Sequence, residues 1–296
     1  MRNARLCAAA MCLALMPAIA FAQDKFFDSN GVTIRYVDQG SGSEPIILLH
    51  GNGGSLQTWV NRGILPNLVR DYRVIAFDAR GHGKSGKPHD PKQYGREAAL
   101  DVVRLLDHLA IRQAHIVGYS MGAATTSHLL TLRPDRFLTA TLIAGVGPFE
   151  WTAQQAREAE QEAMEREKEC VSRSQIYRLA PLNAPKPSED DIKAQSAACF
   201  ADSNQDRFAL AALRRSGGER VINPTVAAAV TVPTLGIVGS LDPNKVGLEA
   251  LKKLRPNLRF IVVDGAVHGG DRGILTRPEL MAALREFLLA NRKSTR

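Results

Sequence analysis

The stretch Gly118-Tyr119-Ser120-Met121-Gly122 decides the fold of this 296-residue chain. It follows the apolar run Ala114-His115-Ile116-Val117 and precedes a helix-like segment that starts at Ala123. A serine held on a tight strand-to-helix turn takes strained backbone angles, and glycine on both sides removes side chains that would crowd it. The order strand, G-x-S-x-G, helix therefore predicts a nucleophile elbow with Ser120 as the nucleophile. The alternative is a glycine-rich turn whose serine has no chemical role.

Short β-rich runs alternate with helical patterns on both sides of this turn. Asn30-Gly31 marks the turn of a β-hairpin near the start of this pattern. Strands are expected at residues 45–49, 73–77, 115–117, 140–144, 234–238 and 259–263, the hairpin at 26–37, and helices at 57–68, 97–109, 123–132 and 280–289. This alternation predicts an α/β fold, with a mostly parallel central sheet flanked by helices on both faces.

The pattern changes between residues 148 and 231. Thr152 to Gln155 has the form of a capping box, and a charged run from Glu158 to Glu169 follows it. Such a run is typical of a solvated helix face. A Pro-rich loop at residues 181–187 and short helical segments come next, without a strand pattern. We therefore expect a helical cap at residues 148–231, inserted into a core formed by residues 23–147 and 232–296.

The first 22 residues have the composition of a secretory signal peptide. Arg2 and Arg5 give a positive start, Leu6 to Met16 is apolar, and Ala20-Phe21-Ala22 offers a small-x-small cleavage site. The apolar run is too short for a spanning helix, although a membrane anchor is the alternative. We expect cleavage after Ala22 and a periplasmic or secreted protein without stable membrane insertion.

Composition and motifs exclude several classes of partner. The chain is 45% hydrophobic and 23% charged, which is ordinary for a globular protein. Its formal charge of +8 falls to +6 without Arg2 and Arg5, and the basic residues are scattered among acids, so nucleic-acid binding is not expected. The phosphate-binding patterns G-x-x-x-x-G-K-[ST] and G-x-G-x-x-G are absent, as are metal-ligand spacings, so we expect no cofactor and no metal. The oligomeric state is left open.

Two cysteines, Cys170 and Cys199, remain after the signal peptide is removed. An exported protein meets oxidising conditions, which favour a disulfide between them. Such a bond would close a loop of about 30 residues and stabilise the protein by roughly 3.5 kcal/mol. Two free thiols are the alternative.

A serine hydroxyl is a poor nucleophile and needs a base within hydrogen-bond reach. His268 lies just beyond the last expected strand, and the carboxyl ends of parallel strands share the edge at which Ser120 stands. Asp242 follows the strand at 234–238 at the same edge and would orient the imidazole. An Asp before Pro is also a common turn residue. Asp264 and Asp271 are rivals, but both lie too close to His268 along the chain.

The oxyanion of an acyl-transfer reaction needs backbone donors, each worth roughly 3–4 kcal/mol. The amide of Met121, directly after the nucleophile, is one candidate. The second is expected in the loop His50-Gly51-Asn52-Gly53-Gly54, where we choose the Asn52 amide and keep Gly53 as the one-residue alternative.

These pieces together resemble the α/β-hydrolase superfamily, in its serine-dependent, capped, esterase-like form. The resemblance rests on the loop 50–54, the stretch Asp78 to Ser85, the elbow 118–122, Asp242 and His268, and it covers about residues 26–147 and 232–292. It implies a Ser120–Asp242–His268 triad and a structural turn at residues 80–85. The Gly269-Gly270-Asp271 stretch departs from the apolar residues expected after the histidine.

Fold alone does not supply a substrate. Haloalkane dehalogenases and epoxide hydrolases of this superfamily use an Asp at the elbow, so Ser120 favours acyl chemistry. We expect an exported carboxylic-ester hydrolase that acts on a small-molecule ester through an acyl-enzyme on Ser120. The alternatives are a lactonase, an amidase or a carbon–carbon bond hydrolase, and a ligand-binding protein without turnover.

Overall fold

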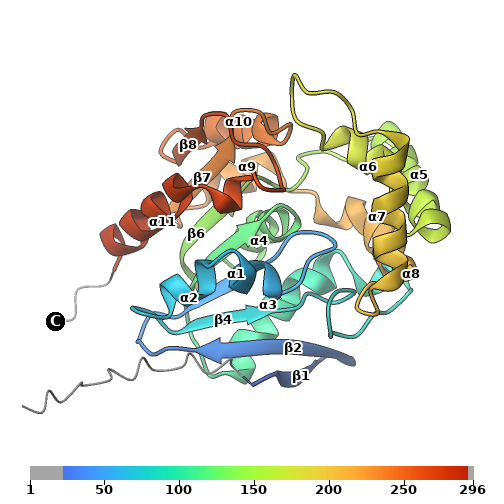
Figure 1. The fold of residues 1–296 in the computed structure, drawn as a ribbon. Helices are drawn as coiled ribbons and strands as arrows, with labels where there is room; N and C mark the ends of the chain where they lie inside the picture. Colours follow the sequence, from blue (N-terminus) through green and yellow to red (C-terminus); the bar gives the residue numbers. More distant parts are fainter. Residues whose placement is uncertain (1–22, 293–296) are drawn as a thin grey trace, which may run out of the picture.

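Eight strands form one sheet in the order β1-β2-β4-β3-β5-β6-β7-β8 (Figure 1). The computed structural model describes residues 23–292. The pairs β1–β2 and β2–β4 are antiparallel and the others are parallel, which confirms the mostly parallel sheet. The strands are β1 (Lys25–Ser29), β2 (Val32–Gln39), β3 (Ile46–Leu49), β4 (Val74–Phe77), β5 (Ala114–Tyr119), β6 (Phe137–Ile143), β7 (Thr234–Gly239) and β8 (Arg259–Val263).

The burial of the strands follows their place in the sheet. Every residue of β3 and β4 is buried, because both faces of these central strands are covered. At the edge, Val262 of β8 is 43% exposed. At the opposite edge, Asn30 and Gly31 turn the β1–β2 hairpin with positive φ angles of 57° and 82°. Those angles match a type I′ turn, whose twist suits paired strands.

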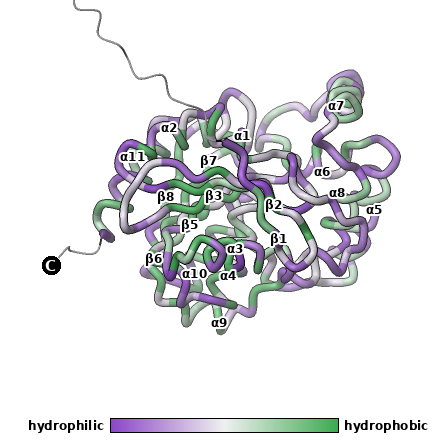
Figure 2. Tube along the Cα trace, turned by 90° about the horizontal axis from the view of Figure 1, so that it is seen from below, coloured by the Kyte–Doolittle hydropathy of each residue, from purple (hydrophilic) through white to green (hydrophobic). Residues whose placement is uncertain are grey.

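Helices cover both faces of the sheet (Figure 2). The layer on one face is formed by α1 (Gln57–Asn61), α2 (Ile64–Leu68) and α11 (Pro278–Ala290). On the other face lie α3 (Arg96–His108), α4 (Met121–Leu132), α9 (Pro224–Ala229) and α10 (Lys245–Leu254). Leu68 of α2 and Leu284 of α11 pack into one apolar cluster, and Leu105 of α3 packs into a second. Single 3₁₀ segments are η1 (Pro91–Gln93), η2 (Pro134–Arg136), η3 (Ser216–Arg220) and η4 (Ile274–Thr276).

The single helix expected at residues 57–68 is wrong, because the structure divides it into α1 and α2. Gly63 stands between them with a φ of +70°, a left-handed conformation that ends a helix and that glycine adopts without steric cost. The break lets Trp59 of α1 and Ile64 of α2 both be buried.

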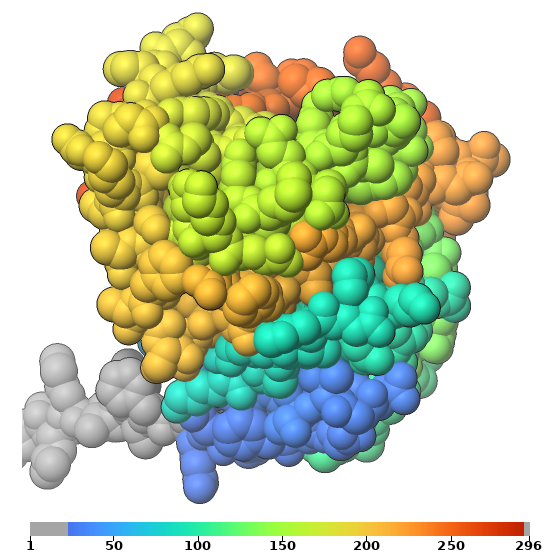
Figure 3. All heavy atoms as spheres, turned by 90° about the vertical axis from the view of Figure 1, so that its right-hand side faces the viewer, coloured from blue at the N-terminus to red at the C-terminus, as the bar shows by residue number. Residues whose placement is uncertain are grey.

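A group of helices without strands separates β6 from β7 within the described chain. They are α5 (Ala153–Glu169), α6 (Arg173–Arg178), α7 (Glu189–Ala201) and α8 (Arg207–Arg215), followed by α9. Helices α5 to α8 gather at one end of the molecule (Figure 1). Figure 3 shows gold atoms of this group against the teal segment, and α8 contacts η1 there. We call α5 to α8 with η3 the cap.

Two local features of the cap follow from its sequence. The capping box is present, because Thr152 accepts from the Gln155 N–H while the Gln155 side chain accepts from the Thr152 N–H. A disulfide joins Cys170 at the end of α5 to Cys199 in α7, with Cα atoms 5.9 Å apart. It joins two cap helices through cysteines that are 29 residues apart along the chain.

The interpretation of the charged run in α5 as a solvated face is wrong for two residues. Glu162 is 2% exposed and Arg166 is 8% exposed. Both face inward because α5 packs along α8, whose Arg214 donates to Glu162 over 2.6 Å. A charged residue is buried where another element supplies its partner.

None of the helices within residues 23–292 is long and apolar enough to cross a membrane. The expected signal peptide, residues 1–22, lies outside the described residues.

Candidate active site

Ser120 stands at the sharp turn between β5 and α4, with φ of 53° and ψ of −112°. Its N–H donates to the Ile143 carbonyl of the neighbouring strand over 2.8 Å, which fixes the turn to the sheet. The flanking glycines are required sterically. A Cβ on Gly118 would lie 2.2 Å from the Gly122 oxygen, and a Cβ on Gly122 would lie 2.1 Å from the Leu49 oxygen.

The structure brings Ser120, His268 and Asp242 into one hydrogen-bonded line. Ser120 Oγ lies 2.9 Å from His268 Nε2, and His268 Nδ1 lies 2.8 Å from Asp242 Oδ2. Because a carboxylate oxygen only accepts, Nδ1 carries the proton and Nε2 is free to accept from the serine hydroxyl. The Asp242 side chain is fully buried, whereas the rival Asp264 contacts Ser240 and not the imidazole.

Two residues that the sequence did not single out hold this line in place. Asn244 donates its backbone N–H to Asp242 Oδ1 over 2.9 Å and its amide to the Ala144 carbonyl over 3.0 Å. The Tyr119 hydroxyl donates to the His268 carbonyl over 2.7 Å, and its ring stacks on the imidazole with centroids 5.4 Å apart. Burial raises the pKa of Tyr119, so the phenol stays a neutral donor. The sequence signal that could have identified Tyr119 was its position next to Ser120 in the G-x-S-x-G pattern.

The backbone donors chosen from the sequence lie around the same serine. A Cβ on Gly51 would lie 3.3 Å from Ser120 Cβ, so the loop after β3 lies directly against the elbow. Among the described residues, the N–H groups of Asn52, Gly53 and Met121 donate to no other protein atom. All three N–H groups are therefore available to donate to a bound oxygen atom.

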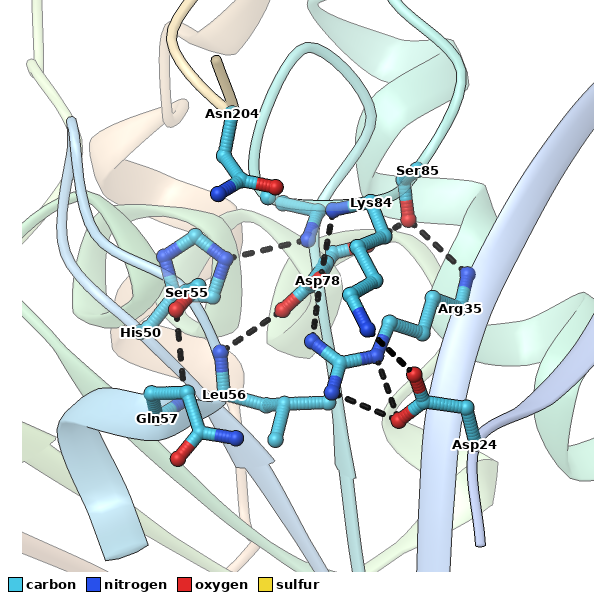
Figure 4. A network of polar contacts seen from close by, with 12 residues as sticks. Asp24, Arg35, His50, Ser55, Leu56, Gln57, Asp78, Lys84, Ser85 and Asn204 are labelled. Atoms are coloured by element: carbon cyan, nitrogen blue, oxygen red, sulfur yellow. Dashed lines mark hydrogen bonds and ion pairs between the residues drawn. The ribbon is translucent and has the colours of Figure 1, made fainter. Parts of the chain in front are cut away.

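Asp78 connects this loop to the turn at residues 80–85 (Figure 4). Its fully buried carboxylate accepts from the Leu56 N–H over 2.7 Å and from the Lys84 N–H over 2.8 Å. Arg35 lies 3.1 Å from the same carboxylate and reaches Asp24 on its other side. The turn at residues 80–85 thus has a structural part in holding the candidate oxyanion loop.

Two buried histidines beside the loop are held neutral. His50 Nε2 accepts from the Ala79 N–H over 3.0 Å, which places its proton on Nδ1, next to the Gly51 carbonyl. Burial lowers the pKa of His50. Burial, followed by repulsion from His50, lowers the pKa of His82 to about 3, and its Nε2 lies 3.2 Å from Asn52 Oδ1. Neither ring contacts Ser120.

Two cavities meet between the cap and the core. One, of about 390 Å³, is lined by Ser120 and Met121, and the other, of about 800 Å³, is lined by His268. Asn52, Gln175 and Leu179 line both. Ser120 and His268 therefore lie at the junction of two cavities.

Known proteins resemble this chain in sequence and in structure. A 2-hydroxy-6-oxo-6-(2'-aminophenyl)hexa-2,4-dienoic acid hydrolase from Metapseudomonas resinovorans is 27% identical, over 86% of this chain and 87% of that protein. The dihydrolipoyllysine-residue acetyltransferase component of the acetoin cleaving system from Cupriavidus necator is 36% identical over 43% of this chain. That match spans only 33% of the relative's length.

Among solved structures, the enol-lactonase from Burkholderia xenovorans LB400 superposes with a TM-score of 0.68 at 22% identity, over 90% of this chain and all of that one. At this identity the likeness shows the fold alone. The model of the alpha/beta hydrolase fold family matches residues 44–270, which include the elbow, the Asp242 turn and His268. The chain therefore belongs to the alpha/beta hydrolase fold family.

Proposed function

We propose that this hydrolase-family protein is a carboxylic-ester hydrolase that works through an acyl-enzyme on Ser120. The observation that carries the proposal is the line from Ser120 Oγ to His268 Nε2 at 2.9 Å and from His268 Nδ1 to Asp242 at 2.8 Å. This is the geometry in which a base removes the hydroxyl proton while a carboxylate orients the base.

The reaction proceeds in two halves. Ser120 Oγ attacks the ester carbonyl carbon as its proton passes to His268 Nε2, and the carbonyl oxygen becomes an oxyanion beside the N–H groups of Met121 and Asn52 or Gly53. The carbon–oxygen bond to the alcohol then breaks, and the proton on His268 leaves with the alcohol. Water loses a proton to His268 and attacks the acyl-enzyme, which releases the acid and regenerates Ser120.

A panel of p-nitrophenyl acetate and butyrate tests the proposal together with a fluorophosphonate probe. We expect turnover of both esters by the unmodified protein, covalent labelling of Ser120, and loss of both in Ser120→Ala. A matched control is Ser127→Ala, which removes a hydroxyl from the same helix at a residue that contacts Gly147 rather than the triad. A protein that binds ligands tightly without labelling Ser120 would contradict any catalytic role.

A second candidate is a carbon–carbon bond hydrolase that uses the same Ser120. The observation that favours it is the relative from Metapseudomonas resinovorans, which matches nearly the whole chain and whose name describes a hydrolase of a dienoic acid. Failure to cleave any ester, together with cleavage of a vinylogous diketone that depends on Ser120, would replace the first candidate by the second.

We also propose that the protein is exported to the periplasm or secreted, with cleavage after Ala22. The disulfide between Cys170 and Cys199 supports this, because such bonds persist in oxidising compartments. Mass spectrometry of the protein purified from its natural location should find an N-terminus at Gln23 and no alkylatable thiol before reduction. An intact leader, or two free thiols, would contradict export.

A further inference from the structure

The cavity that holds Ser120 has an unusually basic wall, formed by cap residues. Arg178 of α6, Arg214 of α8 and Arg220 of η3 all line it. This clustering is not visible in the sequence, because the three residues are scattered over 43 positions of a cap rich in both charges. Their convergence is a product of the way in which the cap helices pack.

Two of these arginines share one buried carboxylate. Arg178 Nε lies 3.1 Å from Glu162 Oε1, and Arg214 Nε lies 2.6 Å from Glu162 Oε2. Arg166 of α5 is also buried, and it donates to the neutral side-chain amide of Gln175. The single negative charge of Glu162 therefore fixes both guanidinium groups but balances only one of them.

Arg220 has no partner. Within residues 23–292 its side chain makes no hydrogen bond or ion pair, and its Nε is fully shielded from solvent and unsatisfied. The residue keeps part of its surface accessible because it faces the cavity. Burial, with repulsion from Arg214 as the smaller cause, lowers the pKa of Arg220 to about 10, which still leaves it charged at neutral pH. A cation whose Nε is buried without a partner is costly, and a bound anion is one explanation for such an unsatisfied group.

We propose that this cavity binds a carboxylate of the substrate through Arg220, with Arg214 beside it, so that the acyl compounds cleaved at Ser120 are anionic. The inference rests on the proposed function, since it assigns the substrate class of the same site. It makes Arg220 a specificity residue of the reaction.

The charge count favours a carboxylate over a phosphate. Of the three arginines that line the cavity, Arg178 and Arg214 pair with Glu162, and Arg220 is the one that has no anionic partner among the described residues. A carboxylate supplies one negative charge in the planar shape that a guanidinium fork matches. A phosphate monoester carries nearly two negative charges.

Two esters of the same chain length, which differ in the negative charge and in one methyl group at the far end, test the proposal. The mono-p-nitrophenyl ester of glutaric acid ends in a carboxylate, and p-nitrophenyl methyl glutarate has the same chain with that end neutralised. We expect the unmodified protein to prefer the first by about 10- to 100-fold in kcat/KM, the range for a hydrogen bond to a charged group. Arg220→Gln should reduce this ratio to near one, mainly through KM of the anionic ester.

Arg215→Gln is the matched control, because Arg215 pairs with Glu160 and Glu167 and does not line the cavity. Arg215→Gln should keep the same ratio of kcat/KM between the anionic and the neutral ester as the unmodified protein. Fluorophosphonate labelling of Ser120 is measured in all three proteins, and free glutarate should slow it only where Arg220 is present.

The outcomes separate the two proposals. Labelling of Ser120 with equal or better turnover of the neutral ester would overturn the anionic substrate and leave the serine hydrolase standing. If Arg220→Gln kept the preference for the anionic ester, the role of Arg220 would be overturned. A p-nitrophenyl ester of the same chain length that ends in a phosphate is assayed beside the two glutarates, and a clear preference for it would overturn the carboxylate. Absence of labelling and of all turnover would overturn the proposed function itself.

Discussion

Gly122→Ala tests how closely the backbone of the elbow approaches the loop after β3. The added Cβ would lie 2.1 Å from the Leu49 oxygen, 2.6 Å from the Leu49 carbon and 2.8 Å from the His50 oxygen. All three are backbone atoms, so no side chain can rotate away. Non-bonded atoms repel steeply well inside their optimal separation of about 3.5 Å, so the loop or helix α4 must retreat by about 1 Å.

The magnitude follows from that displacement. Overpacking of a core costs about 1–3 kcal/mol, and a clash with rigid backbone belongs at the upper end of that range. For a domain of this size, about 3 kcal/mol lowers Tm by roughly 6–12 °C. Because the displaced loop carries Asn52 and Gly53, a shift of about 1 Å at the candidate oxyanion donors should lower kcat by about 100-fold.

Thermal unfolding followed by circular dichroism and the kcat for p-nitrophenyl butyrate measure the two effects. Gly269→Ala is the control, since it makes the same change beside His268 where the new Cβ would meet only the Tyr119 hydroxyl, at an ordinary 3.6 Å. The control should change Tm by only a few degrees. A Gly122→Ala protein with an unchanged Tm and a kcat within twofold of the unmodified protein would refute the reasoning.

Two further predictions concern buried polar groups of the core. Arg80 and Asp101 form a fully buried ion pair with Nη2 and Oδ1 2.5 Å apart. Arg80→Met removes this cation and leaves the carboxylate with Ser29 and the more distant Arg104, so it should lower the free energy of unfolding by about 3–5 kcal/mol in urea titrations. A loss under 1 kcal/mol would contradict this. His82 has its folded pKa lowered to about 3, below the unfolded value of about 6.5, so its share of stability is complete above pH 6.5 and is lost as pH falls towards 3. Between pH 7 and 5 the unmodified protein should therefore lose about 2 kcal/mol more than His82→Gln, and identical pH profiles of the two proteins would rule this out.

Local steric patterns in the sequence predicted much of the fold and of the candidate site. Ser120 between glycines marked the elbow, and the shared edge of a parallel sheet led from it to Asp242 and His268. The hairpin at Asn30-Gly31 and the capping box at Thr152 were equally local. Each of these depends on neighbouring residues, or on a rule that holds for every parallel sheet, so one sequence is enough to predict it.

Other features depended on which elements pack together. The sequence pattern of residues 57–68 is typical of one helix, so it did not predict the break at Gly63. Asn244 donates to Asp242 and Tyr119 donates to the His268 carbonyl, and these contacts form only once the sheet has assembled.

What the sequence by itself determined is the candidate nucleophile Ser120, its turn and the class of fold around it, because backbone sterics and hydrophobic periodicity act between near neighbours. What only the tertiary structure decided is the electrostatics of the cavity above that serine. Glu162 is buried between arginines that lie 16 and 52 residues away along the chain, and Arg220 is left without a partner beside them. The sequence specifies which side chains carry a charge. How far each is desolvated, and which partners it has, depends on how the cap helices pack against one another and against the core.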